Sequence, residues 1–128
     1  MPIGWIATRD VAALMAEAIY KPELAGSSFL VSGLENLDGS QLAQKFSMGL
    51  AQTIRYYPMP PKDFGAILDN LFGEGAGKSA EEMYQQIADT KQYPLMFSHQ
   101  MKHVLEKLPV KMTPLQDWVA QHKEHFLN

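Results

Sequence analysis

The sequence contains no cysteine, which excludes disulfides, thiol nucleophiles and zinc–thiolate sites together. A strong charge of either sign is missing too: 14 Asp and Glu against 11 Lys and Arg give a formal net charge of −3, and the pI is near 5.7. A chain this close to neutral exerts no general electrostatic attraction on nucleic acid or anionic lipid. We therefore expect no nucleic acid and no membrane among its partners.

Long apolar runs are absent as well. No run approaches the roughly 20 apolar residues that span a bilayer. The first ten residues hold neither a basic leader nor a long apolar stretch. Together with the missing cysteine, this predicts a cytoplasmic protein. The apolar residues that are present, 46% of 128, are enough for one core, so we expect a single domain over residues 1–128.

Apolar residues at helical spacing predict about six helices. They run from about residue 10 to 20, 39 to 52, 61 to 72, 79 to 92 and 98 to 107, and from 114 onward. Side-chain caps mark four of the starts, and three of these are capping boxes. The predicted caps are Asp10, Asp38 with Gln41, Ser79 with Glu82, and Thr113 with Gln116. Pro61 and Pro114 suit a first helical turn.

Three short apolar or β-branched segments, at residues 3–8, 27–32 and 54–59, predict strands. Three short strands beside six helices predict an α+β fold that is mainly helical. The strands do not alternate with crossover helices in the regular way that a nucleotide-binding sheet requires. The sequence therefore predicts no complete nucleotide-binding sheet.

The stretch from Gly73 to Ser79 includes Gly-Lys-Ser before a helix, as a phosphate loop does. That loop needs a glycine where Phe72 stands, and it follows a strand where we expect a helix. We interpret the stretch as a flexible turn between two helices.

The four histidines form two pairs with helical spacing, His99 with His103 and His122 with His125. No carboxylate is convincingly paired with either couple, and no His-Glu-x-x-His motif is present. We interpret them as solvated or helix-terminal side chains and expect no metal site.

Aromatic and methionine side chains gather at element ends and in loops, where adaptable apolar groups can line a cleft or an interface. Phe64 and Phe72 are interpreted as core residues. The candidates for a pocket or an interface are Tyr56, Tyr57, Met59, Tyr93, Met96 and Phe97. No residue is assigned a catalytic role.

Five segments, taken in chain order, resemble one known family. They are WIATRDVA at residues 5–12, LAGSSFLVSG at 24–33, LDGSQLA at 37–43, IRYYPMPPKDF at 54–64 and MTPLQDWV at 112–119. The first resembles a strand of that family followed by a helix start, and the second resembles a strand. The third is similar to its Leu-Ser/Thr-x-x-Glu-Leu-Ala segment, the fourth to the short strand, proline and helix that come next, and the last to its terminal Thr-x-Leu-x-Glu/Asp-Phe/Trp-Val helix. The family is the NmrA-like branch of the atypical extended short-chain dehydrogenase/reductases, and the resemblance is to its C-terminal, substrate-side half.

The resemblance implies the C-terminal part of an NmrA-like fold and the binding of a small-molecule substrate. The family binds NADP(H) or NAD(H) through a glycine fingerprint on an N-terminal Rossmann domain. This sequence has no such fingerprint and no Tyr-x-x-x-Lys pair. We therefore expect a substrate-binding domain or fragment of an NAD(P)-dependent oxidoreductase-like protein, truncated naturally or by expression, that neither binds the cofactor nor catalyses by itself.

Two alternatives stay open. One is a non-catalytic redox-sensing or regulatory module, which suits the missing Tyr-x-x-x-Lys pair. The other is a small stand-alone domain that homodimerises. In the family, the strand that corresponds to residues 28–32 lies against the nucleotide domain's sheet. In this chain, residues 28–32 should therefore present an unpaired edge and apolar faces. We therefore also expect a homo-oligomer.

Overall fold

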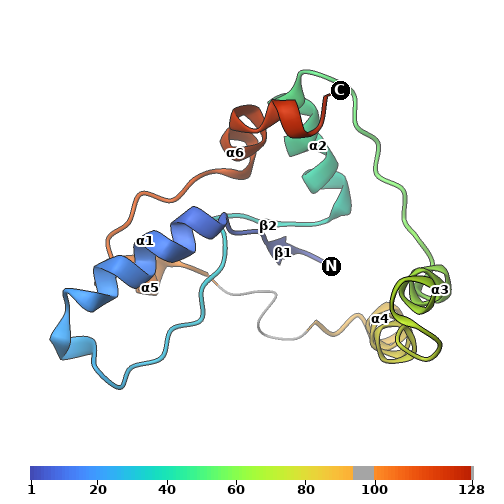
Figure 1. Cartoon of the computed structure of the whole chain (residues 1–128), viewed down its shortest axis with the longest axis horizontal. Coiled ribbons are helices and arrows are strands. Elements are labelled where there is room, and N and C mark those ends of the chain that lie inside the picture. The colour runs from blue at the N-terminus through green and yellow to red at the C-terminus, as the bar shows by residue number, and fades with distance from the viewer. Residues whose placement is uncertain (94–99, 128) are drawn as a thin grey trace. The chain divides into compact units, whose positions relative to one another are not determined.

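The structure, a computed structural model, describes residues 1–93 and 100–127 and divides into two compact units. The first comprises residues 1–56 with the described residues from 100 onward, and the second comprises residues 57–93. Six α-helices and two short strands form in the described residues (Figure 1), which confirms a mainly helical fold. None of these helices is long and apolar enough to cross a membrane.

The elements of the first unit are β1 (Ile3–Gly4), α1 (Thr8–Ile19), β2 (Asn36–Leu37), α2 (Gly39–Leu50), α5 (Lys102–Lys107) and α6 (Leu115–Gln121), with 3-10 turns at Pro22–Leu24 and Lys123–His125. The second unit contains α3 (Pro61–Phe72) and α4 (Lys78–Thr90). β1 and β2 pair antiparallel, with Ile3 opposite Leu37 and Gly4 opposite Asn36. This two-stranded pair is the whole sheet in the described residues.

The prediction of three strands is wrong. Only two residues of the segment 3–8 are in a strand, and the segments 27–32 and 54–59 contain none. Within the part of the chain that the structure describes, the amides of residues 28–31 donate to no backbone carbonyl. An extended segment becomes a strand only when a neighbour supplies the other half of the hydrogen-bond ladder. Residues 28–31 have strand-forming side chains but no partner strand within residues 1–93 and 100–127.

Asp10 does not cap α1, contrary to the prediction. The helix begins at Thr8 and has no side-chain cap. The buried Asp10 carboxylate instead accepts hydrogen bonds from the Thr113 backbone N–H, at 2.7 Å, and from the Thr113 hydroxyl, at 2.9 Å. Thr113 likewise does not cap α6, which begins at Leu115 after Pro114. Both predicted caps are wrong because the two side chains bond to each other across the fold.

The capping box of α2 is confirmed. Asp38 Oδ1 accepts a hydrogen bond from the Gln41 N–H at 2.8 Å, and Gln41 Oε1 accepts one from the Asp38 N–H at 2.9 Å. The predicted box at Ser79 and Glu82 is wrong, because α4 begins earlier, at Lys78, with no side-chain cap. A capping box joins residues three apart and therefore depends on where the helix starts.

The core of the first unit lies between α1 and the chain around α5. Its buried members are Leu14, Met101, Val104, Leu108 and Met112. Phe29 and Val31 pack against this core, whereas Leu30 between them is 49% exposed. The alternation typical of a strand with one buried face thus persists at residues 28–32 without a ladder.

α2 and α6 pack side by side in the same unit (Figure 1). Val119 of α6 is fully buried, and Gly49 of α2 lies against it. A Cβ at Gly49 would lie 2.7 Å from Val119 Cγ1 and 2.9 Å from the carbonyl oxygen of Gln116. Such contacts are shorter than van der Waals distance, so the approach of the two helices depends on glycine.

The second unit is a helical pair. α3 starts at Pro61, as predicted, and packs against α4. Phe64 meets Tyr84 edge to face, with ring centroids 5.4 Å apart. Phe72, interpreted from the sequence as a core residue, is 75% exposed at the C-terminal end of α3, so that interpretation is wrong.

We predict that Gly49→Ala lowers the free energy of unfolding by about 1–3 kcal/mol, because overpacking forces the α2–α6 contact apart. Gly39→Ala is the matched control on the same helix, since both changes add the same methyl group. There the three atoms nearest to the new Cβ all belong to the ring of Tyr56, a 52% exposed side chain that we expect to shift toward solvent. Urea unfolding followed by circular dichroism measures both variants, and equal losses would contradict the packing argument.

Candidate functional site: an apolar cleft beside Arg9

One cavity of the first unit, of about 700 Å³, is lined mainly by apolar side chains. It lies where α2, α6 and the N-terminal end of α1 meet. Its lining residues are Trp5, Ile6, Ala7, Thr8, Arg9, Leu42, Phe46, Thr113, Leu115, Trp118, His122 and Phe126. We call it the Trp118 cleft. Its size suits a small organic molecule.

Aromatic rings form much of the wall of the Trp118 cleft. Phe126 meets Phe46 edge to face at 5.5 Å between centroids, and it meets Trp118 at 6.2 Å and 70°. His122 stacks on Trp118, with centroids 4.5 Å apart and planes inclined by 25°. Edge-to-face and offset-stacked pairs are the arrangements that aromatic rings prefer, so these rings hold one another in place.

Except for Phe46, these rings come from α6 and the turn that follows it. Trp118 lies within α6, His122 is its C-cap residue, and Phe126 follows the 3-10 turn Lys123–His125. The His122 Nδ1 lies 2.7 Å from the carbonyl oxygen of Trp118. Since a carbonyl can only accept, Nδ1 carries the proton, and in the neutral ring Nε2 has a free lone pair.

Arg9 supplies the charge at the Trp118 cleft. Its Nε donates to Thr113 Oγ1 and its Nη1 to Gln121 Oε1, each at 3.3 Å. The nearest carboxylate oxygen, of Asp10, lies 3.8 Å from Nε. The Arg9 side chain is 63% exposed, whereas that of Asp10 is 5% exposed. The guanidinium is therefore anchored from behind by two neutral oxygens and open on the solvent side.

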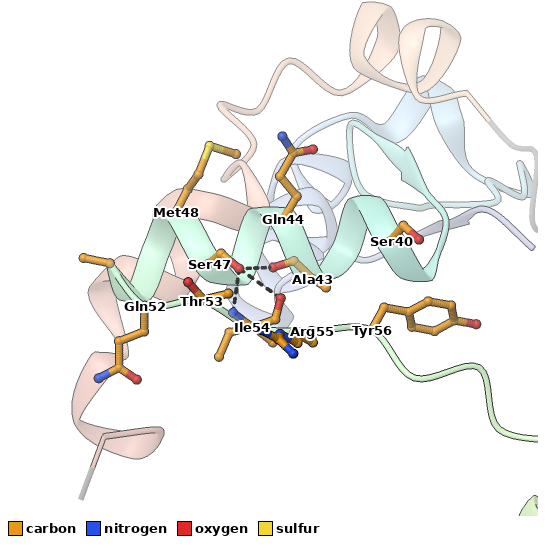
Figure 2. A pocket seen from close by; sticks show the side chains of 11 residues that line it. Ser40, Ala43, Gln44, Ser47, Met48, Gln52, Thr53, Ile54, Arg55 and Tyr56 are labelled. Atoms are coloured by element: carbon orange, nitrogen blue, oxygen red, sulfur yellow. Dashed lines mark hydrogen bonds between the residues drawn. The ribbon is translucent and has the colours of Figure 1, made fainter.

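A second pocket, of about 790 Å³, lies along α2 (Figure 2). In Figure 2 the chain from Thr53 to Tyr56 runs back beneath the helix. The Ser47 hydroxyl holds this return segment: it accepts from the Ile54 N–H at 2.9 Å and lies 2.8 Å from the carbonyl oxygen of Ala43. The return segment, Thr53 to Tyr56, is exposed along its whole length, so a ligand in this pocket would remain largely in contact with water.

The structure separates the pocket candidates that the sequence grouped. Tyr56 lines the second pocket and is 52% exposed. Tyr57, Met59 and Tyr93 are exposed and line neither of the two pockets. Met96 and Phe97 lie outside the described residues. None of the candidates that the structure describes is in the Trp118 cleft.

Sequence reasoning missed Arg9, Phe46 and Trp118 as a group. The spacing of the aromatic residues near the C-terminal end is a signal in the sequence. Their partners in the cleft come from α1 and α2, which are far away in the chain. No local pattern links Arg9 to Trp118.

The glycine-rich stretch at residues 73–79, which looks like a phosphate loop in the sequence, has a structural role. The Gly77 N–H, where an anion would bind in a phosphate loop, donates to Asp69 Oδ1 at 2.7 Å. Among residues 1–93 and 100–127, no group of three or more His, Asp or Glu side chains is arranged to hold a metal ion. His103 lies 3.9 Å from Glu106, and both are largely exposed; His99 is outside the described residues.

The arrangement of the Trp118 cleft suits binding. Its polar side chains are Thr8, Arg9, Thr113 and His122. The Thr113 hydroxyl donates to one oxygen of the buried Asp10 carboxylate, whose other oxygen accepts from the Thr113 N–H, so this pair is a structural contact. Comparison with known proteins found no matching family model, no matching curated protein and no matching solved structure.

We predict that Thr113→Val lowers the free energy of unfolding by about 1–3 kcal/mol, because it leaves one oxygen of the buried Asp10 carboxylate without a donor. The matched control is Thr53→Val, an exposed site where we expect a change within about 0.5 kcal/mol. Thermal unfolding measures both variants. Similar melting temperatures for the two would contradict a structural role for the Asp10–Thr113 contact.

Proposed function

We propose that this chain is the substrate-binding domain of an NmrA-like NAD(P)-dependent oxidoreductase-like protein, and that its substrate binds in the Trp118 cleft. One observation carries the proposal. Three of the five segments that resemble the family, residues 5–12, 37–43 and 112–119, each contribute lining residues to this one cavity, whereas residues 24–33 and 54–64 contribute none. Segments that are far apart in sequence and jointly line a cavity support a shared binding role.

The shape and chemistry of the Trp118 cleft favour a small organic ligand. Its walls are mostly apolar, and a few polar groups stand at defined places, which is the usual composition of a small-molecule site. Arg9 and the His122 Nε2 offer a donor and an acceptor. Binding, rather than chemistry, is what these groups provide.

The exposed backbone and apolar side chains around residues 28–31 favour the presence of a partner domain. The amides of residues 28–31 have no backbone acceptor in the described chain, and Leu30 and Leu34 are 49% and 50% exposed. Trp5, on the chain leading from β1 to α1, is 51% exposed. Unpaired backbone groups beside apolar side chains are a template for pairing with another sheet. A nucleotide-binding domain with a parallel sheet would satisfy these groups, in line with the expected fold.

Hydrogen exchange tests whether the backbone amides of residues 28–31 are unpaired. We expect the amides of residues 28–31 to exchange almost unprotected in the dilute chain, because they have no backbone acceptor among the described residues. The amides within α2 serve as the protected reference. Strong protection at residues 28–31 in the dilute chain would contradict an open edge. Protection that rises with the concentration of the chain would favour the alternative in which a second copy covers the edge.

Equilibrium dialysis against NADPH and NADH tests the expectation that this chain alone does not bind the dinucleotide. We expect no saturable binding by this chain alone, because the pyrophosphate of a dinucleotide is held by a glycine-rich turn at a helix N-terminus and the sequence has no such fingerprint. Binding of one equivalent of either nucleotide by the purified chain would contradict the proposal.

A further inference from the structure

We propose that the ligand of the Trp118 cleft is a planar aromatic carboxylate, whose carboxylate is bound by Arg9 and whose ring packs against the aromatic wall. This inference rests on the proposed function, since it names the ligand class of the same cleft. Three observations lead to it: the composition of the wall, the unused donors of Arg9 and the lack of any other charge in the lining.

The wall selects for a flat ring. Trp5, Phe46, Trp118 and Phe126 line one cavity of about 700 Å³. Three of these rings are already fixed by contacts with one another, so the cleft keeps its shape without a ligand. Aromatic groups pack on such rings by edge or by offset face and gain more than from apolar area alone. A flexible aliphatic chain would lose more rotational freedom on binding.

Arg9 selects for a carboxylate. Its guanidinium has five N–H donors, and two of them are used, one at Nε and one at Nη1. Within the described chain the remaining N–H groups of Nη1 and Nη2 have no acceptor. One of these N–H groups is on Nη1 and two are on Nη2. Donors on two neighbouring nitrogens can match the two oxygens of a carboxylate, and such a charge-assisted pair is stronger than a neutral one.

The charge near Arg9 is only partly compensated. Asp10 lies 3.8 Å from Nε, but its two oxygens accept from the Thr113 N–H and hydroxyl, and its side chain is almost fully buried. The contact therefore lies on the protein side of the guanidinium. No other residue in the described lining has a fixed charge. An anion that enters the cleft meets one exposed cation and no exposed anion.

Two probes of the same shape test the inference: 2-naphthoate, which is anionic, and 2-naphthamide, which is neutral. Isothermal titration calorimetry measures both affinities. Both tryptophans of the chain line the Trp118 cleft, so their two indole N–H signals in an NMR spectrum show where a probe binds. We expect naphthoate to bind about tenfold more tightly than naphthamide, with both indole signals shifting.

Arg9→Gln removes the charge, and Arg55→Gln is the matched control at the only other arginine of the chain, which does not line the cleft. We expect Arg9→Gln to bring the ratio of the naphthoate affinity to the naphthamide affinity to about one, and Arg55→Gln to leave that ratio at its value in the unaltered chain. Circular dichroism checks that each variant is folded, and the comparison of the two probes on the unaltered chain does not depend on any variant.

The outcomes separate this inference from the proposed function. Equal affinity for the two probes, with both indole signals shifting, would overturn the carboxylate while the cleft remained a small-molecule site. A preference for naphthoate that survives Arg9→Gln would overturn the role of Arg9. Failure of both probes to shift the indole signals would overturn the inference and also the proposed location of the substrate.

Discussion

The first unit depends on one buried contact, the double hydrogen bond from Thr113 to the carboxylate of Asp10. It joins the first turn of α1 to the segment before α6. A buried carboxylate without donors would be strongly destabilising, so the two segments are tied together wherever the unit is folded. Arg9, the neighbour of Asp10, is anchored on the same threonine. The charge of the cleft is thereby placed in the same lining as Trp118 of α6.

The second constraint is the close packing of α2 on α6, which Gly49 permits. It brings Phe46 within reach of Phe126 and closes the cleft from the α2 side. The cleft therefore arises where two independent tertiary contacts converge. The cavity is therefore preformed, because both contacts exist without a ligand and leave its walls little freedom to collapse.

Local interactions explain which sequence-based predictions were confirmed. The Asp38–Gln41 box and the start of α3 at Pro61 involve residues within one helical turn, and the structure contains both. Asp10 has the same residue type and a similar local context as Asp38, yet a distant threonine takes its carboxylate. The pocket candidates were chosen from residues at element ends, and of those that the structure describes only Tyr56 lines one of the two pockets. The grouping of side chains around the cleft required knowledge of which helices meet.

By itself, the sequence determined the mainly helical character, the approximate helix positions and the cap of α2, because helical hydrogen bonds and capping boxes join residues at most four apart. Only the tertiary structure decided that residues 28–31 form no strand in this chain, that Asp10 bonds to Thr113, and that Arg9 stands beside Trp118. Strand ladders, buried carboxylates and cavities all need partners supplied from distant parts of a chain, and no local pattern specifies those partners.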